Sequence, residues 1–503
     1  MKGKVWLVGA GPGNAGLMTI RGREVLEQAD VVVYDALIGA EILNMIPEDA
    51  RLIFAGKRSG NHFLKQEEIN RILLEEALSG NRVVRLKGGD PFLFGRGGEE
   101  LELLVHHDVP FEVVPGVTSA ISVPAYNGIP VTHRDLSSGV HIITGHMREN
   151  RSYDIDFTLL AKSRETLVFL MGIEAIPEIC DGLIKAGMDP DVPAAILEKG
   201  TTALQRRITA TVGTLEEESR KKQTATPAII VIGNVCELAD RYGWYEKKSL
   251  SGIRIVVTRP RELSSRLASM LREEGAEVFE IPAIRIVPVK AAIKEAGIFE
   301  KLEHKKVDWI VFTSPSGIRV FFDQLITERD IRILSGIKIA VLGSGTCDEL
   351  LKHGIKADFV PSSYTGEALG RELAGLVKKP TEIMILRAAI GNKELTDELG
   401  KNPLISVTDV ATYDTVYERS RIYDLEKMTE SGGYDFAVFT SASTVRGFAN
   451  AAGKTDLRKV KAVCIGKQTA NEAENYGMQT RIAGKATLKD LVQCVIDLKE
   501  NDL

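Results

Sequence analysis

Two patterns of hydrophobic residues alternate along the chain. Runs that are apolar almost throughout, such as 5–9, 30–35 and 82–86, predict β-strands covered on both faces, because a half-exposed strand would alternate polar and apolar residues. Further runs of this kind lie at 111–115, 140–145, 166–172 and 227–233. The stretches 17–29 and 66–80 instead have helical spacing, and the second ends at a glycine. The alternation predicts the α/β class.

The pattern changes at residues 243–252, which are polar and small and precede a new predicted strand at 253–260. We expect a domain boundary there. Beyond it the sequence repeats itself. The segment 308–322 returns at 435–449, and 339–354 returns at 461–477, at separations of 127 and 123 residues. Two copies of one unit predict two similar α/β lobes with a ligand cleft between them.

Composition reduces the number of protein classes to which the chain can belong. The chain has 503 residues, of which 44% are hydrophobic and 26% charged, with a net charge of −5, so no overall basic charge favours nucleic acid. Residues 113–132 carry no charge, but three prolines interrupt them, and we expect a buried loop and helix rather than a membrane span. Five scattered cysteines without a CxxC spacing, and an N-terminus that enters a strand directly, predict a cytoplasmic chain without a metal site.

Two glycine-rich loops follow predicted strands. The first, VGAGPGN at 8–14, lacks the last glycine of a dinucleotide fingerprint, which disfavours a nucleotide-dependent dehydrogenase. The second, RLKGGDPFLFGRGGEE at 85–100, exposes backbone groups for recognition, with Asp90 as a ligand for hydroxyls or a cap and Arg96 as a carboxylate binder. Farther on, His133 and Arg134 offer donors to a substrate beside a proline-fixed turn, although a lone histidine is often structural.

The ordered motifs GAGPGN, VVVYDALIG, GKRSGNHFLKQEEIN, VVRLKGGDPFLFGRGGEE, VVPGVTSA, GIPVTHR and TLVFLMG closely resemble the uroporphyrinogen-III C-methyltransferases of the tetrapyrrole methylase family. The likeness covers residues 3–240. It implies a fold of two α/β subdomains, association into a homodimer, and two methyl transfers from S-adenosyl-L-methionine to uroporphyrinogen III, giving precorrin-2, with sirohaem and cobalamin both open as its fate.

The same resemblance implies site residues. Asp35 corresponds to a proton acceptor, Lys57 to a proton donor, and Arg85 and Arg96 to arginines of activity or substrate binding. The implied cofactor shell consists of Pro12, Gly88, Gly89, Asp90, Leu93, Thr118, Ser119, Met171 and Gly200. A carboxylate suits the chemistry, because the methylated pyrrole becomes cationic and must lose a proton. The alternatives are a strand-end cap for Asp35 and core packing for Met171.

Residues 251–500 resemble uroporphyrinogen-III synthase through IRIVVTRP, WIVFTSPSG, AVLGSGT, VATYDTVY, AVFTSAS and VCIGKQTA. The resemblance implies cyclisation of hydroxymethylbilane with inversion of its last ring, without metal or cofactor. It also implies discontinuous lobes, one of about 251–285 plus 418–503 and the other of about 286–417, joined by crossing strands near 283–288 and 411–418. A domain of 1–245 would then precede a two-lobed domain of 251–503.

Hydroxyl side chains recur at predicted strand ends in this half. Thr313, Ser314, Thr346, Thr440, Ser441 and Thr469 are candidates to hold the carboxylates of a folded substrate. Tyr413 corresponds to a tyrosine near the family's cleft, where a phenol can assist departure of the terminal hydroxyl. Turn formation by each Ser or Thr, and ordinary packing of Tyr413, are the alternatives.

The two resemblances predict a bifunctional enzyme, because the product of one half is the substrate of the other. The alternative keeps the methyltransferase and makes the C-terminal half a non-catalytic tetrapyrrole-binding or regulatory module. Formation of only spontaneous uroporphyrinogen I from hydroxymethylbilane would favour that alternative.

Overall fold

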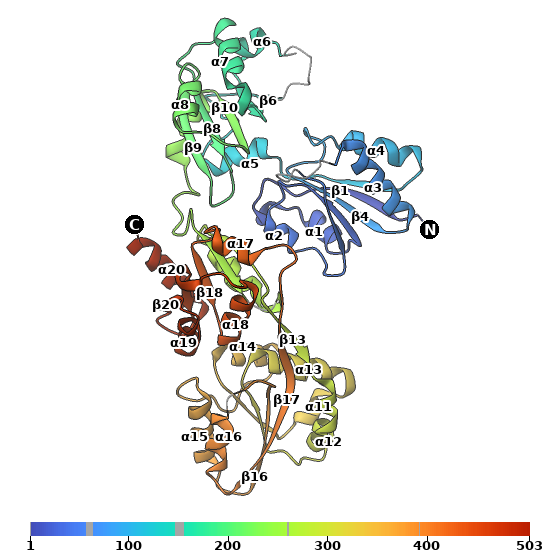
Figure 1. The fold of residues 1–503 in the computed structure, drawn as a ribbon, viewed down its shortest axis with the longest axis vertical. Coiled ribbons are helices and arrows are strands. Elements are labelled where there is room, and N and C mark those ends of the chain that lie inside the picture. The colour runs from blue at the N-terminus through green and yellow to red at the C-terminus, as the bar shows by residue number, and fades with distance from the viewer. Residues whose placement is uncertain (1, 57–63, 146–154, 259–260, 392, 503) are drawn as a thin grey trace.

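The computed structural model describes residues 2–56, 64–145, 155–258, 261–391 and 393–502. The described residues form four five-stranded sheets, each with helices around it, so the predicted α/β class is confirmed. The first two sheets lie in the upper part of Figure 1 and the last two below them. Within the described residues, no helix combines the length and the apolar character that crossing a membrane requires.

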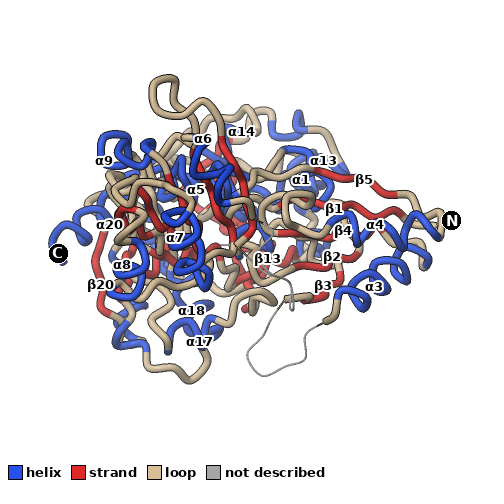
Figure 2. Tube along the Cα trace, turned by 90° about the horizontal axis from the view of Figure 1, so that it is seen from above, coloured by secondary structure: helices blue, strands red, loops and turns tan. Residues whose placement is uncertain are grey.

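The first sheet is entirely parallel, in the order β3-β2-β4-β1-β5. Figure 2 shows its strands side by side. They are β1 (Lys4–Gly9), β2 (Val31–Tyr34), β3 (Arg51–Phe54), β4 (Arg82–Lys87) and β5 (Phe111–Val114). The helices of this part are η1 (Ala15–Leu17), α1 (Ile20–Leu26), α2 (Ala40–Leu43), α3 (Gln66–Leu78) and α4 (Gly97–His106). Alternate residues of the strands enter separate apolar clusters, so both faces are buried as predicted.

The second sheet, in the order β6-β7-β10-β8-β9, is mixed, and only β6 and β7 run parallel. Its strands are β6 (Val140–Thr144), β7 (Thr166–Leu170), β8 (Pro193–Glu198), β9 (Arg206–Thr211) and β10 (Ala228–Ile232). Its helices are α5 (Ser119–Tyr126), α6 (Phe157–Ser163), η2 (Ile173–Ala175), α7 (Ile176–Lys185), α8 (Leu215–Lys221), η3 (Asn234–Leu238) and α9 (Ala239–Tyr242). The uncharged stretch 113–132 contains α5, as the expected buried helix.

The third sheet is parallel, in the order β12-β11-β18-β19-β20. Its strands are β11 (Arg254–Thr258), β12 (Glu277–Glu280), β18 (Phe436–Phe439), β19 (Lys461–Cys464) and β20 (Gln479–Ile482). Its helices are α10 (Arg261–Glu273), α17 (Leu425–Glu430), α18 (Ala442–Ala451), η5 (Leu457–Lys459), α19 (Lys467–Asn475) and α20 (Leu488–Asp502). Strands from both ends of the C-terminal half therefore share one sheet.

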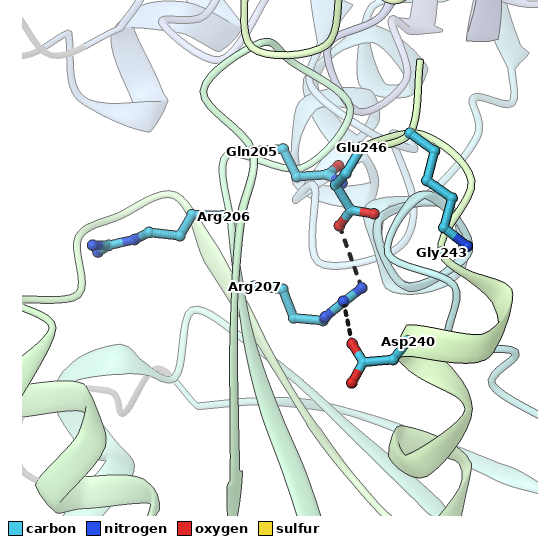
Figure 3. Close-up of a pocket in the computed structure, with 7 residues that line it drawn as sticks. Gln205, Arg206, Arg207, Asp240, Gly243 and Glu246 are labelled. Carbon is cyan, nitrogen blue, oxygen red and sulfur yellow. Dashed lines mark hydrogen bonds and ion pairs between the residues drawn. The ribbon is translucent and has the colours of Figure 1, made fainter. Parts of the chain in front are cut away.

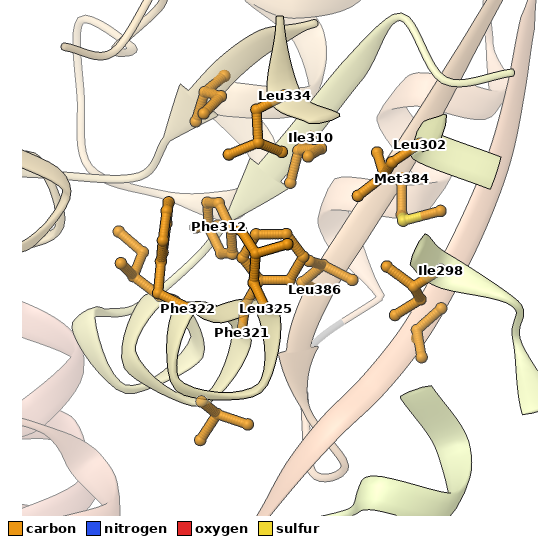
Figure 4. Packing of buried hydrophobic residues seen from close by; sticks show 14 of the residues in the cluster. Ile298, Leu302, Ile310, Phe312, Phe321, Phe322, Leu325, Leu334, Met384 and Leu386 are labelled. Carbon is orange, nitrogen blue, oxygen red and sulfur yellow. The ribbon is translucent and has the colours of Figure 1, made fainter. Parts of the chain in front are cut away.

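The fourth sheet, in the order β13-β17-β16-β14-β15, is formed by the chain between them. Its strands are β13 (Ile284–Pro288), β14 (Trp309–Phe312), β15 (Lys338–Val341), β16 (Thr381–Ala388) and β17 (Ile405–Tyr417). Its helices are α11 (Lys290–Glu295), α12 (Ile298–Glu303), α13 (Pro315–Glu328), η4 (Ile331–Leu334), α14 (Ser344–Lys352), α15 (Gly366–Leu376) and α16 (Glu394–Gly400). One face is filled by a cluster in which Phe312, Phe321 and Phe322 are fully buried (Figure 4).

The chain enters and leaves the fourth sheet through one pair of strands. β13 and β17 are antiparallel, and Ile284 at the start of β13 is the register partner of Tyr417 at the end of β17. This confirms the two crossing strands expected near 283–288 and 411–418. The predicted internal repeat is also confirmed, because β14–α13 corresponds to β18–α18 and β15–α14 to β19–α19.

The N-terminal and C-terminal halves contact each other through α2 and the loop that follows it. Arg272 of α10 donates to Glu41 of α2 (Nε to Oε1, 2.9 Å) and to Glu280 of β12 (Nη2 to Oε1, 2.7 Å). Asn44 donates through Nδ2 to the carbonyl of Glu280 at 2.8 Å. The guanidinium of Arg421 donates to four backbone carbonyls, those of Ile46, Pro47, Glu48 and Ala50. These polar contacts fasten the two halves together.

The connector 243–252 is also anchored at both ends. The indole of Trp244 donates to the carbonyl of Ala125 at 3.0 Å, and its ring packs against Tyr126 and Tyr245. Leu250 is fully buried in a core cluster of the third sheet. Although the polar composition of the segment is typical of a linker, its few apolar residues attach it to the domains on either side.

Candidate functional site

Two glycine loops meet at the carboxyl edge of the first sheet. Gly11, after β1, and Gly89, after β4, form a backbone bridge in which each amide donates to the other's carbonyl, at 3.2 and 2.7 Å. Both have positive φ, +78° and +67°, which glycine adopts without a Cβ clash. A Cβ on Gly116 would lie 2.2 Å from the carbonyl oxygen of Gly89, so a third loop also approaches closely. The glycines thus let three loops converge.

Asp90 fixes the second and third loops. Its Oδ1 accepts from the amides of Phe92 and Leu93 at 2.8 and 3.1 Å, and its Oδ2 accepts from the amide of Gly116 at 3.0 Å. Both oxygens therefore bind backbone amides of the chain itself, the capping behaviour that the sequence left open for this residue. Leu93, in the same turn, packs against a core cluster of the second sheet.

The other predicted cofactor residues lie on loops from both sheets. Thr118 caps α5 by accepting from the amide of Ala120 at 3.2 Å, and Ser119 begins that helix. Pro12 and its neighbours approach the loop after β8, where the hydroxyl of Thr201 accepts from the amide of Asn14 at 3.3 Å. Gly200 in that loop is required by packing, since a Cβ there would lie 2.3 Å from Val123.

Met171 follows β7 in an unusual conformation. Its φ is +55°, a left-handed value that is uncommon for a residue with a side chain, and its side chain is 52% exposed. The alternative interpretation of Met171 as simple core packing is therefore wrong. The backbone of Met171 is strained and its thioether is exposed to solvent.

A group of charged side chains is buried next to these loops. Arg85 and Lys87 lie on the same face of β4, two residues apart, with exposures of 4 and 5%, and Glu100 of α4 is fully buried. Glu100 Oε1 accepts from Arg85 Nε at 3.1 Å, from Lys87 Nζ at 2.7 Å and from Gln66 Nε2 at 3.2 Å. Burial, together with the nearby Arg85 guanidinium, lowers the pKa of Lys87.

This buried group reaches Asp35, which follows β2. Arg85 Nη2 donates to Asp35 Oδ2 at 3.3 Å, and its Nη1 is within 3.4 Å of the carbonyl oxygens of Val33 and Leu86. Asp35 Oδ1 and Glu100 Oε2 are buried and have no hydrogen-bond partner among the described residues. A carboxylate held by an arginine beside the converging loops can stabilise a cationic ring and accept a proton from it.

Arg96 and His133 have hydrogen-bond partners other than the members of that group. Arg96, with a positive φ of +56°, is exposed and pairs with Glu99 through both Nε and Nη2. His133 forms a turn with Ser137 through two backbone hydrogen bonds, and Arg134 beside it is exposed. Lys57 lies outside the described residues.

In the C-terminal half, the predicted hydroxyls lie at the carboxyl edges of the third and fourth sheets. Ser314 caps α13 after β14, and Ser441 caps α18 after β18. Thr313 is partly buried, while Thr346 of α14 and Thr469 of α19 are each 4% exposed. Tyr413 of β17, itself 5% exposed, has its phenol oxygen 2.7 Å from Ser314 Oγ. Burial raises the pKa of Tyr413, so this phenol stays protonated at neutral pH.

An open pocket of about 470 Å³ lies elsewhere, between β9 and the end of α9 (Figure 3). It is lined by Gln205, Arg206, Arg207, Asp240, Gly243, Glu246 and Lys247, none of which is a predicted site residue. Arg207 in its wall is already paired with Asp240 at 2.8 Å and Glu246 at 3.3 Å, which satisfies its charge. The pocket is therefore not the candidate site.

Sequence reasoning missed Lys87 and Glu100. A signal was present, because two cations interrupt the otherwise apolar strand VVRLK and buried cations require a carboxylate. Which of the many acidic residues supplied it depends on how α4 packs on β4, and no local pattern contains that information.

Comparisons with known proteins divide the chain in two. Residues 4–216 match the family described as Tetrapyrrole (Corrin/Porphyrin) Methylases, and residues 265–493 match the one described as Uroporphyrinogen-III synthase HemD. "Porphyrin biosynthesis protein HemD" of Ruminiclostridium josui is 45% identical over 497 residues, which is 99% of this chain and 98% of that protein.

Two further proteins are similar over parts of the chain. "Uroporphyrinogen-III C-methyltransferase" of Bacillus subtilis (strain 168) is 40% identical over 357 residues, 70% of this chain and 72% of that one. A crystal structure of uroporphyrin-III C-methyl transferase from Thermus thermophilus, complexed with S-adenyl homocysteine, is 38% identical with a TM-score of 0.40 and covers 46% of this chain and 93% of that chain.

Proposed function

The chain belongs to the tetrapyrrole methylases in its N-terminal half and to the uroporphyrinogen-III synthases in its C-terminal half, and from this premise we propose that it catalyses two consecutive reactions. It cyclises hydroxymethylbilane to uroporphyrinogen III and then transfers two methyl groups to that product from S-adenosyl-L-methionine, giving precorrin-2. The observation that carries the proposal is the presence of both families in one chain, since the product of one reaction is the substrate of the other.

The converging loops of the first half supply a place for the methyl donor. Gly89 supports this, because a Cβ there would meet nothing nearer than the amide nitrogen of Ser119 at 3.9 Å, so the backbone borders a space that a ligand can fill. Pro12, Gly88, Gly89, Asp90, Leu93, Thr118, Ser119, Met171 and Gly200 would hold the donor. When bound, it supplies an electrophilic methyl group on a sulfonium.

Asp35 would act on the pyrrole ring that accepts this methyl group. Arg85 orients the Asp35 carboxylate through Oδ2, and this carboxylate would stabilise the developing positive charge and take the ring proton. Lys57, Arg96, His133 and Arg134 would contact the polycarboxylate substrate or transfer protons. The proposal requires the substrate to lie between Asp35 and the donor, with the attacking carbon in line with the methyl group.

In the second half, shape and hydrogen bonding would direct ring closure. Thr313, Ser314, Thr346, Ser441 and Thr469 would surround the carboxylates of the bilane. The Ser314–Tyr413 pair supports a polar contact for the departing hydroxyl, because a protonated phenol can donate to it. We infer no cofactor for this half.

We also infer which residues form each of the two enzyme domains. Residues 1–245 would form the methyltransferase and 251–503 the synthase, with lobes of about 251–285 plus 418–503 and about 286–417. The shared sheet of β11, β12, β18, β19 and β20, and the separate sheet between them, support this division.

We further infer that the chain forms a homodimer through its first half. Light scattering of the whole chain measures whether it is a dimer.

The decisive experiment supplies hydroxymethylbilane and S-adenosyl-L-methionine to the purified chain and analyses the products by mass spectrometry and chromatography. Precorrin-2 is expected. If only the type I isomer appears, and added uroporphyrinogen III is still methylated, the C-terminal half is the non-catalytic module of the alternative interpretation. If added uroporphyrinogen III is not methylated either, the methyltransferase assignment fails.

A further inference from the structure

Four ionisable side chains of the first half form one continuous network of balanced charge, of which Arg85, Lys87 and Glu100 are buried and Asp35 is partly exposed. Arg85 and Lys87 bring two positive charges, and Asp35 and Glu100 bring two negative ones. Glu100 is the member farthest from solvent, at 0% exposure. A buried charge is tolerated only with partners of opposite sign, so the network is tightly interdependent.

Glu100 is the junction of this network. Three donors, from β4 and α3, converge on its Oε1, while its Oε2 is buried without a partner among the described residues. The hydrogen bonds of Glu100 therefore lie on the side of its carboxylate that faces Arg85 and Lys87.

The contact through Nε determines where the rest of the Arg85 guanidinium lies. Because the guanidinium is planar, fixing Nε at Glu100 Oε1, 3.1 Å away, fixes the direction of both Nη atoms. Nη2 then reaches Asp35 Oδ2 at 3.3 Å, while the buried Oδ1 has no hydrogen-bond partner among the residues that the structure describes. Without the negative charge of Glu100, Arg85 and Lys87 would both have only Asp35 as a counter-charge in this network.

We propose that Glu100 is a positioning residue for methyl transfer, which orients the Arg85 guanidinium and, through it, the carboxylate of Asp35. The inference rests on the proposed methyltransferase function and adds to it a residue that does not touch the substrate. Its effect on Asp35 is indirect, through the Arg85 guanidinium.

The test uses the full chain with Glu100→Gln, which keeps the shape of the side chain and removes its charge. Steady-state methylation of uroporphyrinogen III should show kcat reduced about 10- to 100-fold, the range expected when a charged hydrogen bond that orients a reacting group is lost. KM for S-adenosyl-L-methionine and binding of S-adenosylhomocysteine measured by calorimetry should change less than about two-fold, because the loops themselves are untouched.

Three comparisons keep the outcome interpretable. Glu102→Gln, an exposed residue of the same helix, should behave as wild type. Glu100→Asp, which restores the charge on a shorter side chain, should recover part of the lost kcat. Cyclisation of hydroxymethylbilane by the same samples should be unchanged, which reports on the integrity of the rest of the chain.

Two results would overturn the inference. A full wild-type kcat for Glu100→Gln would mean that Asp35 does not depend on Glu100. Loss of S-adenosylhomocysteine binding in parallel with kcat, without rescue by Glu100→Asp, would mean that Glu100 only maintains the fold. Failure of the wild-type chain itself to methylate would instead refute the proposed function, which keeps the two failures distinct.

Discussion

At the scale of single residues, Asp35 is the side chain on which the proposed methyl transfer depends most. Asp35→Asn keeps a group that Arg85 can approach but removes the charge and the basic oxygen. Methylation of uroporphyrinogen III should fall by about 10²- to 10⁴-fold, the usual contribution of a positioned general base. Cyclisation by the same preparation should not change. Methylation at the wild-type rate would remove Asp35 from the mechanism.

Tyr413 offers the corresponding test in the second half. Tyr413→Phe removes the hydroxyl that meets Ser314 Oγ at 2.7 Å and leaves the buried ring in place. Formation of uroporphyrinogen III should slow at least about 10-fold if the phenol assists the departing hydroxyl. Because the pKa of Tyr413 is raised above its usual value, wild-type cyclisation should not show the titration of this phenol below about pH 10.

The control for this variant is Tyr417→Phe, at the exposed end of the same strand. It should cyclise hydroxymethylbilane at the wild-type rate. Equal rates for wild type and both variants would show that shape alone, without the Tyr413 hydroxyl, directs ring closure.

The residue scale also shows where sequence reasoning stops. The resemblance pointed to both Asp35 and Arg85, and the structure brings them into contact. Asp90 was a candidate for ligand binding or capping, and only the fold reveals that both of its oxygens already bind backbone amides. Glu100 could not have been chosen over Glu99, because the difference between them is burial, which packing decides.

At the scale of elements, Glu112 joins the edge strand β5 to β1 and α1. Its carboxylate accepts from Arg21, from Lys4 at 2.8 Å and from Trp6 at 3.0 Å. The Arg21 guanidinium, followed by Lys4, lowers the pKa of Glu112 to about 2. A carboxyl whose pKa is depressed on folding stabilises the protein above its unfolded pKa and ceases to do so as pH falls through the folded value.

Glu112→Gln should therefore lower the melting temperature most above about pH 5, and the difference from wild type should shrink as pH falls toward about 3. Calorimetry of the two chains over this range measures the effect. Glu102→Gln serves as the exposed control. A difference independent of pH would mean that Glu112 acts through packing rather than through its charge.

Elements differed in how well their pattern predicted them. The ends of the buried strands β1, β4, β7 and β10 were predicted within two residues, because their runs are mostly apolar. In the N-terminal half, we did not predict β3, β8 and β9. β3 has only four residues, and β9 mixes polar and apolar side chains, so neither differs enough from a loop. Their pairing partners, rather than their own residues, determine them.

The internal repeat extends to an ion pair that the sequence comparison did not single out. Arg319 of α13 pairs with Glu349 of α14 at 3.1 Å, and the equivalent Arg446 of α18 pairs with Glu472 of α19 at 3.2 Å. Each pair joins the helices that follow neighbouring strands. Equivalent positions thus hold equivalent contacts in the third and fourth sheets.

At the scale of the whole molecule, the two halves are held together around Arg272. Arg272→Ala would leave the partly buried Glu41 and Glu280 without their shared cation, which should weaken the contact between the two halves. Hydrogen exchange of the amides of α2 and β12 should become faster than in wild type. Arg266→Ala, an exposed residue of the same helix, is the matched control.

The effect of Arg272→Ala should depend on pH. Burial raises the pKa of Glu41, and the Arg272 charge opposes that rise. Since a raised carboxyl pKa favours the docked state only while the group is protonated, docking of the variant should weaken as pH increases through that raised value. Exchange rates at α2 that match wild type at every pH would show that the other contacts between the halves suffice.

The antiparallel pair β13 and β17 has a consequence for building new proteins from this chain. Because Ile284 and Tyr417 are adjacent, everything between them can be regarded as a cassette with neighbouring ends. A tight turn in its place would reconnect the chain without distorting the sheet that contains β11 and β18. Conversely, the cassette has its own apolar centre and could be transplanted into a surface turn of an unrelated host.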